Sequence, residues 1–370
     1  MQTVTLPEAA APVISVVVLA WRQTDRLLDC LAALAASESA PSFETIVVLN
    51  GAAPEVRELV RSGVQGAVVV DIEHNVGFGG GCNRGVAAAR GSLLLFLNDD
   101  AIVQPGLLRA LSDRVLDDEG IAAAAAVLLN PDGTLQEAGS RVLADAGTVQ
   151  LGAGLAPDSP EAAPYLTARD IDYGSGAALM VRRAAFDAVG GFDPIYEPAY
   201  FEDVDLSFRL KAAGHRVVLE PSARATHATG SSTAADPRFR TFAADHAGTA
   251  FIARWSTTLT GAPDRDASPE VLRAIDAADA PITDTAPRTP AETSASITAD
   301  YVLWLSAQLD ATQARVDALE AEGAAARAKE AELNATAHAL RTRLDDLESR
   351  GPVGIVKWQL GMLKNRPTAK

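Results

Sequence analysis

Short apolar runs alternate with segments of helical periodicity through the N-terminal part of the chain. The apolar runs cover residues 14–20, 43–49, 67–72 and 93–97, and the first of them is rich in β-branched residues. Continuous runs of this kind are typical of strands that a parallel sheet buries on both faces. The intervening helical segments would supply the crossovers that parallel strands require. The pattern therefore predicts an α/β fold built on a doubly wound parallel sheet.

The fourth apolar run stops abruptly at three polar residues, Asn98, Asp99 and Asp100. The carboxyl ends of parallel strands form the edge at which open α/β sheets bind ligands. Two adjacent carboxylates repel each other unless a cation lies between them, and such oxygen ligands suit Mg²⁺ or Mn²⁺. A solvated loop or a helix N-cap before Pro105 is the alternative interpretation of these three residues alone.

The composition excludes some functions and compartments. The formal charge of −16 and the isoelectric point near 4.7 disfavour a generic nucleic-acid-binding surface, which is basic. The two cysteines, Cys30 and Cys82, match no metal or redox spacing, so free thiols in a reducing cytosol are expected. The apolar run at residues 13–20 is far shorter than the roughly 20 residues that span a bilayer, so it is interpreted as a strand.

The second half of the chain follows a different rhythm. Residues 144–168 form a long excursion rich in Gly, Ala and Pro, after a turn signal at residues 130–133. Beyond this excursion the pattern predicts strands at residues 177–181 and 215–220 and helices at residues 183–189, 202–213 and 237–255. Pro221 is expected to end the second of these strands.

The C-terminal part predicts three segments beyond a domain at residues 1–257. Residues 258–298 have a linker composition, and residues 299–350 keep one heptad frame, which favours a coiled coil that joins copies of the chain into a homo-oligomer. One helix folded back on the domain is the alternative. Residues 351–370 are basic and contain Trp358, so this tail could lie on an anionic membrane surface or be a frayed solubilising end.

A glycine run at residues 75–85 separates the third strand from its helix. Such a loop lets backbone N–H groups and a helix N-terminus approach a phosphate or ribose closely. The run lacks the Lys and Ser/Thr of a P-loop, and Cys82 stands where the dinucleotide fingerprint needs its third glycine. A tight turn without ligand is the alternative.

Two further sites could join the acidic strand end. Glu202, Asp203 and Asp205 open a predicted helix, and three acids are more than the helix dipole needs, although Asp205 could be structural. A partly desolvated acid near a metal-bound phosphate can accept a proton from an attacking hydroxyl. His227 follows a strand expected beside the acidic edge, and an imidazole could complete an oxygen-rich Mn²⁺ site.

Taken together, these blocks resemble the family 2 glycosyltransferases of GT-A fold, and most closely their bacterial rhamnosyltransferase-like and galactofuranosyltransferase-like branch. The resemblance covers residues 13–251. It rests on four ordered blocks. The first three are the first strand with Trp21, the glycine run at 75–85 and the DXD-like block at 97–100. The fourth is a series of three short motifs: Gly191-Phe192-Asp193, then Glu202 to Leu206, then His227-x-x-Gly230-x-Ser231.

The resemblance implies an inverting transfer of a sugar from a nucleoside-diphosphate donor to a hydroxyl of a cell-envelope, polysaccharide or lipid-linked acceptor. It also implies a cytoplasmic location, either free or peripheral at the inner face of the plasma membrane. It assigns Asp100, Asn98 and His227 to a divalent cation, Mn²⁺ or Mg²⁺, and Asp203 to the general base. Glu202 and Asp193 would lie on the acceptor or donor-sugar side. The nucleotide and pyrophosphate would be lined by Asn50, Asn75, Gly77, Gly79, Asn83, Arg84 and Asp99.

The second strand departs from the family pattern. It usually ends in an acid followed by Asn, whereas here Leu49 precedes Asn50, so the acid that would contact the base is missing. This departure supports a competing hypothesis, a glycan- or nucleotide-binding scaffold without turnover. A nicotinamide-dependent enzyme is disfavoured, because no acid follows the glycine run at the required distance.

Overall fold

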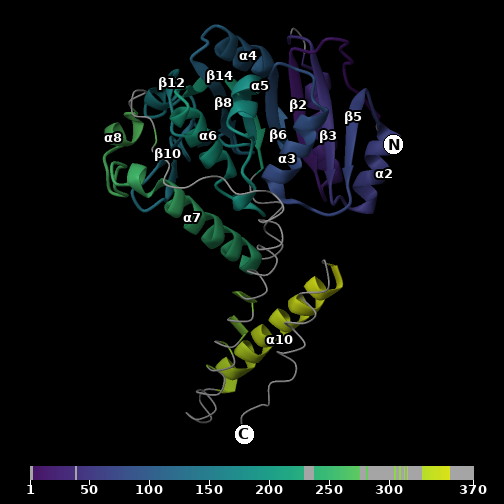
Figure 1. Ribbon diagram of the computed structural model, residues 1–370, viewed down its shortest axis with the longest axis vertical. Helices are drawn as coiled ribbons and strands as arrows, with labels where there is room; N and C mark the ends of the chain where they lie inside the picture. The colour runs from purple at the N-terminus through teal and green to yellow at the C-terminus, as the bar shows by residue number, and fades with distance from the viewer. Residues whose placement is uncertain are drawn as a thin grey trace. The chain divides into compact units, whose positions relative to one another are not determined.

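The computed structural model describes residues 3–37, 40–228, 237–275, 281, 304–305, 308–309, 312, 315 and 327–350. The chain divides into two compact units, Met1–Pro290 and Ala291–Lys370, and each is considered by itself. The first unit has the α/β architecture that the sequence predicts, with helices on both faces of a central sheet (Figure 1).

The central sheet has ten strands in the order β12-β14-β8-β13-β6-β2-β3-β5, with β7 beside β14 and β9 beside β8. Its strands are β2 (Ile14–Ala20), β3 (Phe43–Asn50), β5 (Ala67–Ile72), β6 (Leu93–Asn98), β7 (Ala101–Val103), β8 (Ile121–Leu129), β9 (Leu135–Glu137), β12 (Arg169–Asp170), β13 (Ala178–Arg182) and β14 (Arg216–His227). Two small sheets pair β1 (Val4–Thr5) with β4 (Val64–Gln65) and β10 (Ser140–Val142) with β11 (Thr148–Gln150). The four predicted N-terminal strands are confirmed, and they run parallel as neighbours.

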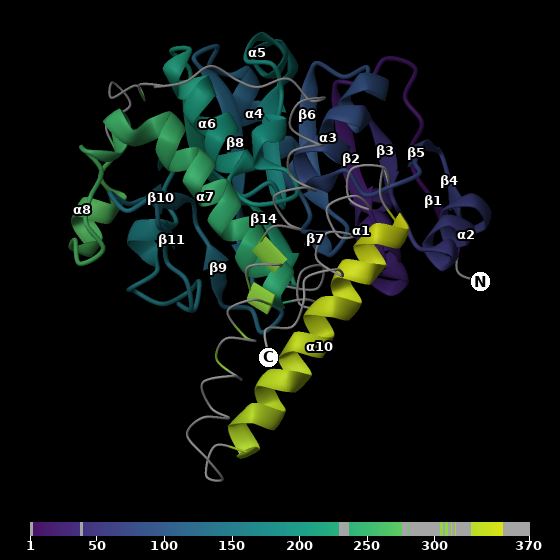
Figure 2. The same ribbon diagram turned by 60° about the horizontal axis from the view of Figure 1, so that its bottom comes forward.

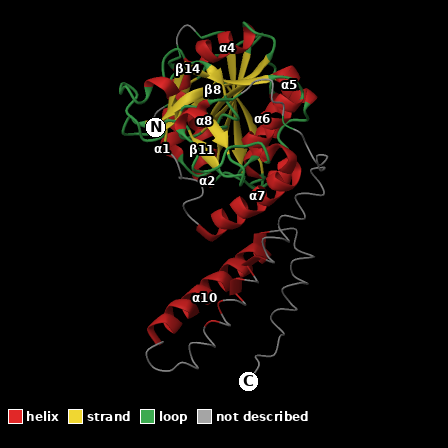
Figure 3. Ribbon diagram, turned by 90° about the vertical axis from the view of Figure 1, so that its left-hand side faces the viewer, coloured by secondary structure: helices red, strands yellow, loops and turns green. Residues whose placement is uncertain are grey.

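Helices pack on both faces of this sheet (Figure 3). One core lies against α1 (Thr24–Ala35), α2 (Pro54–Gly63) and α4 (Leu107–Leu116), and the other against α3 (Gly77–Ala88), α5 (Arg183–Ala188) and α6 (Glu202–Ala212). Along β2, Val16 and Val18 belong to the first core and Val17 to the second, because successive strand residues point to opposite faces. This double burial explains why the strands read as continuous apolar runs.

The parallel arrangement that the N-terminal strands predict does not extend to β13. This strand runs antiparallel between β6 and β8, with Ala178 opposite Leu97 and Leu179 opposite Ala125. An apolar run carries no information about strand direction, so the sequence could not reveal it. The consequence is that β13 begins beside the carboxyl end of β6, at the edge where Asn98 lies.

The prediction that Pro221 ends its strand is also wrong. β14 continues to His227 across a register shift between Glu220 and Arg224, because a proline is tolerated where the ladder is already interrupted. The extended strand pairs with β7, so that His227 lies opposite Ala101 (Figure 2). This pairing brings His227 next to Asp100.

The glycine run is part of a helix rather than a loop. α3 begins at Gly77, and its glycines at positions 77, 81 and 85 follow the four-residue spacing of one helix face. A Cβ added to Gly85 would lie 2.5 Å from Val17 Cγ1, and one added to Gly81 would lie 2.8 Å from Leu19 Cδ2. These glycines therefore let α3 approach the sheet more closely than any other residue would allow.

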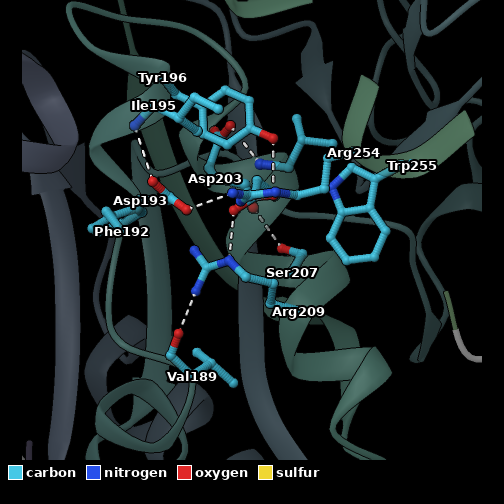
Figure 4. A network of polar contacts seen from close by, with 12 residues as sticks. Val189, Phe192, Asp193, Ile195, Tyr196, Asp203, Ser207, Arg209, Arg254 and Trp255 are labelled. Atoms are coloured by element: carbon cyan, nitrogen blue, oxygen red, sulfur yellow. Dashed lines mark hydrogen bonds and ion pairs between the residues drawn. The ribbon is translucent and has the colours of Figure 1, made fainter. Parts of the chain in front are cut away.

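A buried ionic cluster joins α7 (Pro237–Leu259) to α6 (Figure 4). Arg254 places Nη1 2.9 Å from Asp205 Oδ1 and Nη2 2.7 Å from Asp193 Oδ2. Tyr196 and Trp255 also donate hydrogen bonds to Asp205 Oδ1, both at 2.9 Å. The structural role considered for Asp205 is confirmed. The placement of Asp193 on the sugar side is wrong, because its carboxylate is buried in this cluster.

The C-terminal segments match their predictions only in part. The composition predicts a linker from residue 258, but residues 258–275 belong to the first unit. They contain the end of α7 and the helix α8 (Pro269–Arg273), and Arg265 forms an ion pair of 2.9 Å with Asp145. In the second unit, α10 (Arg327–Arg350) is a continuous helix. Its buried side chains on the predicted heptad frame are Ala337, Leu340 and Leu344.

The other C-terminal predictions fall on positions without a described structure. These are the linker from 276 to 298 except Pro281, most of the heptads from 299 to 326, and the basic tail at 351–370. Among the helices that are described, none is both long and apolar enough to cross a membrane.

The ionic cluster leads to a stability prediction. Arg254→Met should lower the free energy of unfolding by about 3–5 kcal/mol, because it leaves the buried carboxylate of Asp193 without its cation and that of Asp205 with Arg209 alone. The matched control is Arg265→Met, whose ion pair is exposed and should contribute little. Urea unfolding monitored by tryptophan fluorescence measures both, and equal stability losses in the two variants would contradict the assignment.

Candidate active site

The carboxyl edge of the central sheet brings together the ends of β6 and β14. Asp100 Oδ1 lies 3.1 Å from His227 Nε2, and Asn98 Nδ2 lies 3.1 Å from the same nitrogen. All three residues were predicted as metal ligands. The side chains of Asp100 and His227 are buried, at 6% and 10% exposure. The sequence-distant strand ends therefore meet as predicted.

Arg26 of α1 borders this group on its exposed side. Its Nη1 lies 3.4 Å from Asp100 Oδ2 and donates a hydrogen bond of 3.1 Å to the carbonyl of Ala228. The guanidinium thus links the acidic strand end to the residue that follows His227. Nothing in the sequence marks Arg26 as a site residue, because a single arginine in a helix indicates no site until the fold places that helix against the sheet edge.

The donor set fits a divalent cation in part. A carboxylate oxygen and an imidazole nitrogen 3.1 Å apart can both reach one ion, and Mg²⁺ or Mn²⁺ commonly takes its other ligands from water and a bound phosphate. Within the described residues, no three His, Cys, Asp or Glu side chains converge as a complete site would require. Asn98 Nδ2 lies 3.1 Å from the imidazole, so its side-chain amide is at the site, and its role as an oxygen ligand stays a prediction.

Asp99 differs from its neighbour in environment. Its carboxylate accepts a hydrogen bond from the backbone N–H of Trp21, at the end of β2. Burial, together with repulsion from Asp100, raises the pKa of Asp99 to about 7. The two adjacent acids therefore have different partners, Trp21 for one and Arg26 with His227 for the other.

The predicted base lies on the same edge. Asp203 Oδ2 accepts a hydrogen bond of 3.0 Å from the N–H of Gly176, and the next carbonyl, that of Ala177, accepts one of 3.2 Å from the N–H of Asn98. This short path of backbone bonds joins the base to the end of β6. It exists because β13 is antiparallel and begins at that edge.

Glu202 precedes the base in α6 and is more deeply buried. Its Oε2 has no hydrogen-bond partner among the described residues. Burial, together with the charge of Asp203, raises the pKa of Glu202 to about 8, and burial also raises the pKa of Asp203. A base with a raised pKa accepts a proton more readily near neutral pH.

A third acid, which no sequence pattern marks, lies beside this pair. Glu137 of β9 is buried and accepts a hydrogen bond of 3.0 Å from the N–H of Ser175, next to the residue that binds Asp203. Burial, together with the charge of Asp203, raises the pKa of Glu137 to about 7. The turn signal at residues 130–133 was recognised, but the three-residue strand that follows it is too short to show a period.

The start of α3 is already satisfied by protein groups. The N–H of Val76 donates to Asn50 Oδ1 at 3.0 Å, and that of Gly77 donates to Asn75 Oδ1 at 2.8 Å. The N–H of Phe78 donates to the carbonyl of Pro198 at 3.3 Å. The side chains of Asn50 and Asn75 thus cap the start of the helix, and contact of this segment with the nucleotide or pyrophosphate stays a prediction.

Three other predicted nucleotide residues lie along α3. Asn83 bonds both backbone groups of Phe192, with its Nδ2 2.8 Å from the carbonyl and its Oδ1 3.0 Å from the N–H. A Cβ on Gly79 would lie 3.0 Å from Phe192 Cβ. Arg84 is exposed, and its charge acts on the partly buried Glu197. Asn83 and Gly79 thus position the segment before α6, whereas a nucleotide contact by Arg84 stays a prediction.

Comparisons with known proteins agree with the geometry. A family model described as Glycosyltransferase like family 2 matches residues 11–241. The O-antigen biosynthesis protein RfbC of Myxococcus xanthus is 30% identical over 239 residues, which are 63% of this chain and 18% of that protein. The N-acetylglucosaminyl-diphospho-decaprenol L-rhamnosyltransferase of Mycobacterium tuberculosis is 32% identical over 185 residues, 44% of this chain and 59% of that protein.

A solved structure covers more of the chain at lower similarity. The mannosyltransferase PcManGT from Pyrobaculum calidifontis, in complex with GDP-Man and Mn²⁺, is 15% identical with a TM-score of 0.47, over 91% of this chain and 85% of its own. The chain spans less than two thirds of the length of both curated relatives.

The raised pKa of Glu202 predicts a pH dependence of stability. A carboxyl whose pKa rises from about 4.5 to about 8 on folding contributes stability that is complete below pH 4.5 and is lost as the pH rises through 8. Glu202→Gln should therefore flatten the decline in unfolding free energy across that range.

The measurement is urea unfolding at several pH values for the wild type, Glu202→Gln and the control Glu58→Gln, whose side chain is exposed. The control should keep the wild-type slope. An unchanged slope in Glu202→Gln would mean that this carboxyl ionises alike in the folded and unfolded chain.

Proposed function

The chain belongs to glycosyltransferase-like family 2, and we propose that it transfers a sugar, with inversion, from a nucleoside-diphosphate donor to an acceptor hydroxyl. The observation that carries this proposal is the convergence of Asp203 with the Asp100–His227 pair at one sheet edge. A base and a cation-binding pair on a common edge are what a displacement at a phosphorylated sugar requires.

In the proposed mechanism Asp100 and His227 would hold the divalent cation, Mn²⁺ or Mg²⁺, which would supply positive charge to the diphosphate leaving group. Arg26, beside Asp100, adds a positive charge on the same side. Asp203 takes the proton from the acceptor hydroxyl, and the N–H of Gly176 fixes the orientation of its carboxylate. Glu202 and Glu137 keep a proton more readily than exposed acids and so limit the negative charge around the base.

We assign the donor to a dTDP-rhamnose-like or UDP-hexose-like class and the acceptor to a cell-envelope polysaccharide or lipid-linked glycan. The names of the two curated relatives support this choice. The nucleotide base would meet no acid at the end of β3, because the buried Leu49 stands where the family usually has an acid. The side chain of the next residue, Asn50, is bonded to the start of α3. The missing acid also supports the alternative function, a scaffold that binds a glycan or nucleotide without turnover. Transfer assays with a panel of nucleotide sugars, with and without Mn²⁺, would distinguish this scaffold from an active transferase.

The heptads support a further proposal, that the segment around α10 joins chains into a homo-oligomer. Ala337, Leu340 and Leu344 recur on one face of α10 at the spacing of a coiled-coil seam. Deletion of residues 300–350 should lower the mass measured by light scattering while transfer to a soluble acceptor persists. A monomeric full-length chain would contradict this proposal.

We also propose a cytoplasmic location with membrane contact through the basic tail. Liposome sedimentation at low and high salt tests this contact.

Removal of the base gives the sharpest kinetic prediction. Asp203→Asn should lower kcat by about 10²–10⁴-fold while the KM for the donor stays near the wild-type value, because proton acceptance is lost but the cation pair is intact. The matched control is Asp187→Asn, an exposed position on α5 that should keep full activity. Wild-type turnover in Asp203→Asn would show that the base lies elsewhere.

Metal dependence is tested separately from the base. Dialysis against EDTA should abolish transfer, and Mn²⁺ should restore it in the wild type but much less in Asp100→Asn, since that substitution removes the carboxylate ligand. Activity that survives exhaustive chelation would rule out the cation role assigned to Asp100 and His227.

A further inference from the structure

We infer that Gln136 is a positioning residue for the candidate cation site, because its amide holds His227 in the tautomer that turns an unprotonated Nε2 toward Asp100. The inference rests on the proposed function and deepens it. Gln136 belongs to β9, in the segment where the sequence showed no pattern, and nothing in the motif analysis pointed to it. Its contacts decide the state of the imidazole.

The amide of Gln136 can adopt only one orientation. Its Nε2 lies 2.9 Å from the backbone carbonyl of His227 and 3.1 Å from Asn130 Oδ1. A backbone carbonyl only accepts hydrogen bonds, so the amide nitrogen must face it. The amide oxygen then faces the imidazole, with Oε1 2.7 Å from His227 Nδ1.

Asn130 fixes the second acceptor in the same way. Its Nδ2 donates to the backbone carbonyl of Leu135 at 3.3 Å and to Thr134 Oγ1 at 3.0 Å. Because that carbonyl cannot donate, Asn130 must turn its oxygen toward Gln136. Two backbone carbonyls, of Leu135 and His227, thus determine the orientation of both amides.

The consequence reaches the imidazole. An oxygen acceptor 2.7 Å away requires a proton on His227 Nδ1, and in the neutral ring this leaves Nε2 as an acceptor. Nε2 is the atom 3.1 Å from Asp100 Oδ1, so in this tautomer its lone pair faces the carboxylate, as a cation shared by the two side chains would require. A histidine that ligates a metal through one nitrogen commonly donates from the other, which fixes its ring and raises its basicity.

A purely structural role for Gln136 is the competing explanation. The same hydrogen bonds connect β9 to β14, so a substitution could weaken binding only by loosening the strands. Two substitutions separate these roles. Gln136→Met keeps the shape but removes every hydrogen bond, whereas Gln136→Glu loses both donated bonds but keeps an acceptor for Nδ1.

The experiment titrates the full chain with Mn²⁺ alone and follows unbound Mn²⁺ by electron paramagnetic resonance. Gln136→Met should bind Mn²⁺ about 10–100-fold more weakly than the wild type, and Gln136→Glu should stay within about threefold of it. His227→Ala gives the level expected when the ligand itself is absent. Wild-type affinity in Gln136→Met, or an equal loss in both variants, would overturn the inference.

The wild-type chain provides a test that does not depend on how a variant folds. Nitrogen NMR of ¹⁵N-histidine-labelled protein at about pH 8, above the ordinary pKa of histidine near 6.5, reports the tautomer directly. His227→Ala assigns the signal among the five histidines. A proton on Nδ1 is expected, and a proton on Nε2 would overturn the inference.

The two proposals fail in different ways. A wild-type chain that binds no Mn²⁺ but shows the expected tautomer would contradict the cation site of the proposed function while the hydrogen-bond argument for Gln136 holds. A chain that binds Mn²⁺ through the other tautomer would contradict the inference and leave the proposed function in place.

Discussion

The antiparallel pairing of β13 with β6 is the constraint on which the candidate site depends. It places the turn before β13 at the carboxyl end of β6, where the N–H of Asn98 bonds to Ala177 and the N–H of Gly176 bonds to Asp203. A parallel β13 would begin at the opposite edge and separate the base from Asp100 by the length of the strand. The continuation of β14 beyond Pro221 has a matching effect for His227.

The electrostatics of this edge follow from burying several acids together. Burial raises the pKa of Asp99 and Glu137 to about 7 and that of Glu202 to about 8, and mutual repulsion adds to each shift. Arg26 offsets part of the charge at Asp100. A divalent cation would relieve more of this repulsion, since an opposite charge nearby favours the ionised carboxylate. The site thus suits a ligand that brings positive charge together with phosphate.

The sequence predicted the elements of this structure better than their connections. Apolar runs identified β2, β3, β5 and β6, and the positions of Asp100 after β6 and of Asp203 at the start of α6 were predicted correctly. Strand direction, the bulge after Pro221 and the close packing of α3 were missed, because apolar periodicity reports burial and not partners. Gln136 and Glu137 were invisible for a related reason. Their strand has three residues, and their roles arise only from the residues that the fold places beside them, His227 of β14 for Gln136 and Ser175 before β13 for Glu137.

The most direct measurement of the central claim is the anomalous scattering of Mn²⁺ in crystals of the full chain. The account predicts one strong peak at about 2.0–2.4 Å from both Asp100 Oδ1 and His227 Nε2, with Asp203 facing it across the same edge. A peak that contacts neither side chain, or Asp203 and Asp100 on opposite faces of the sheet, would contradict it.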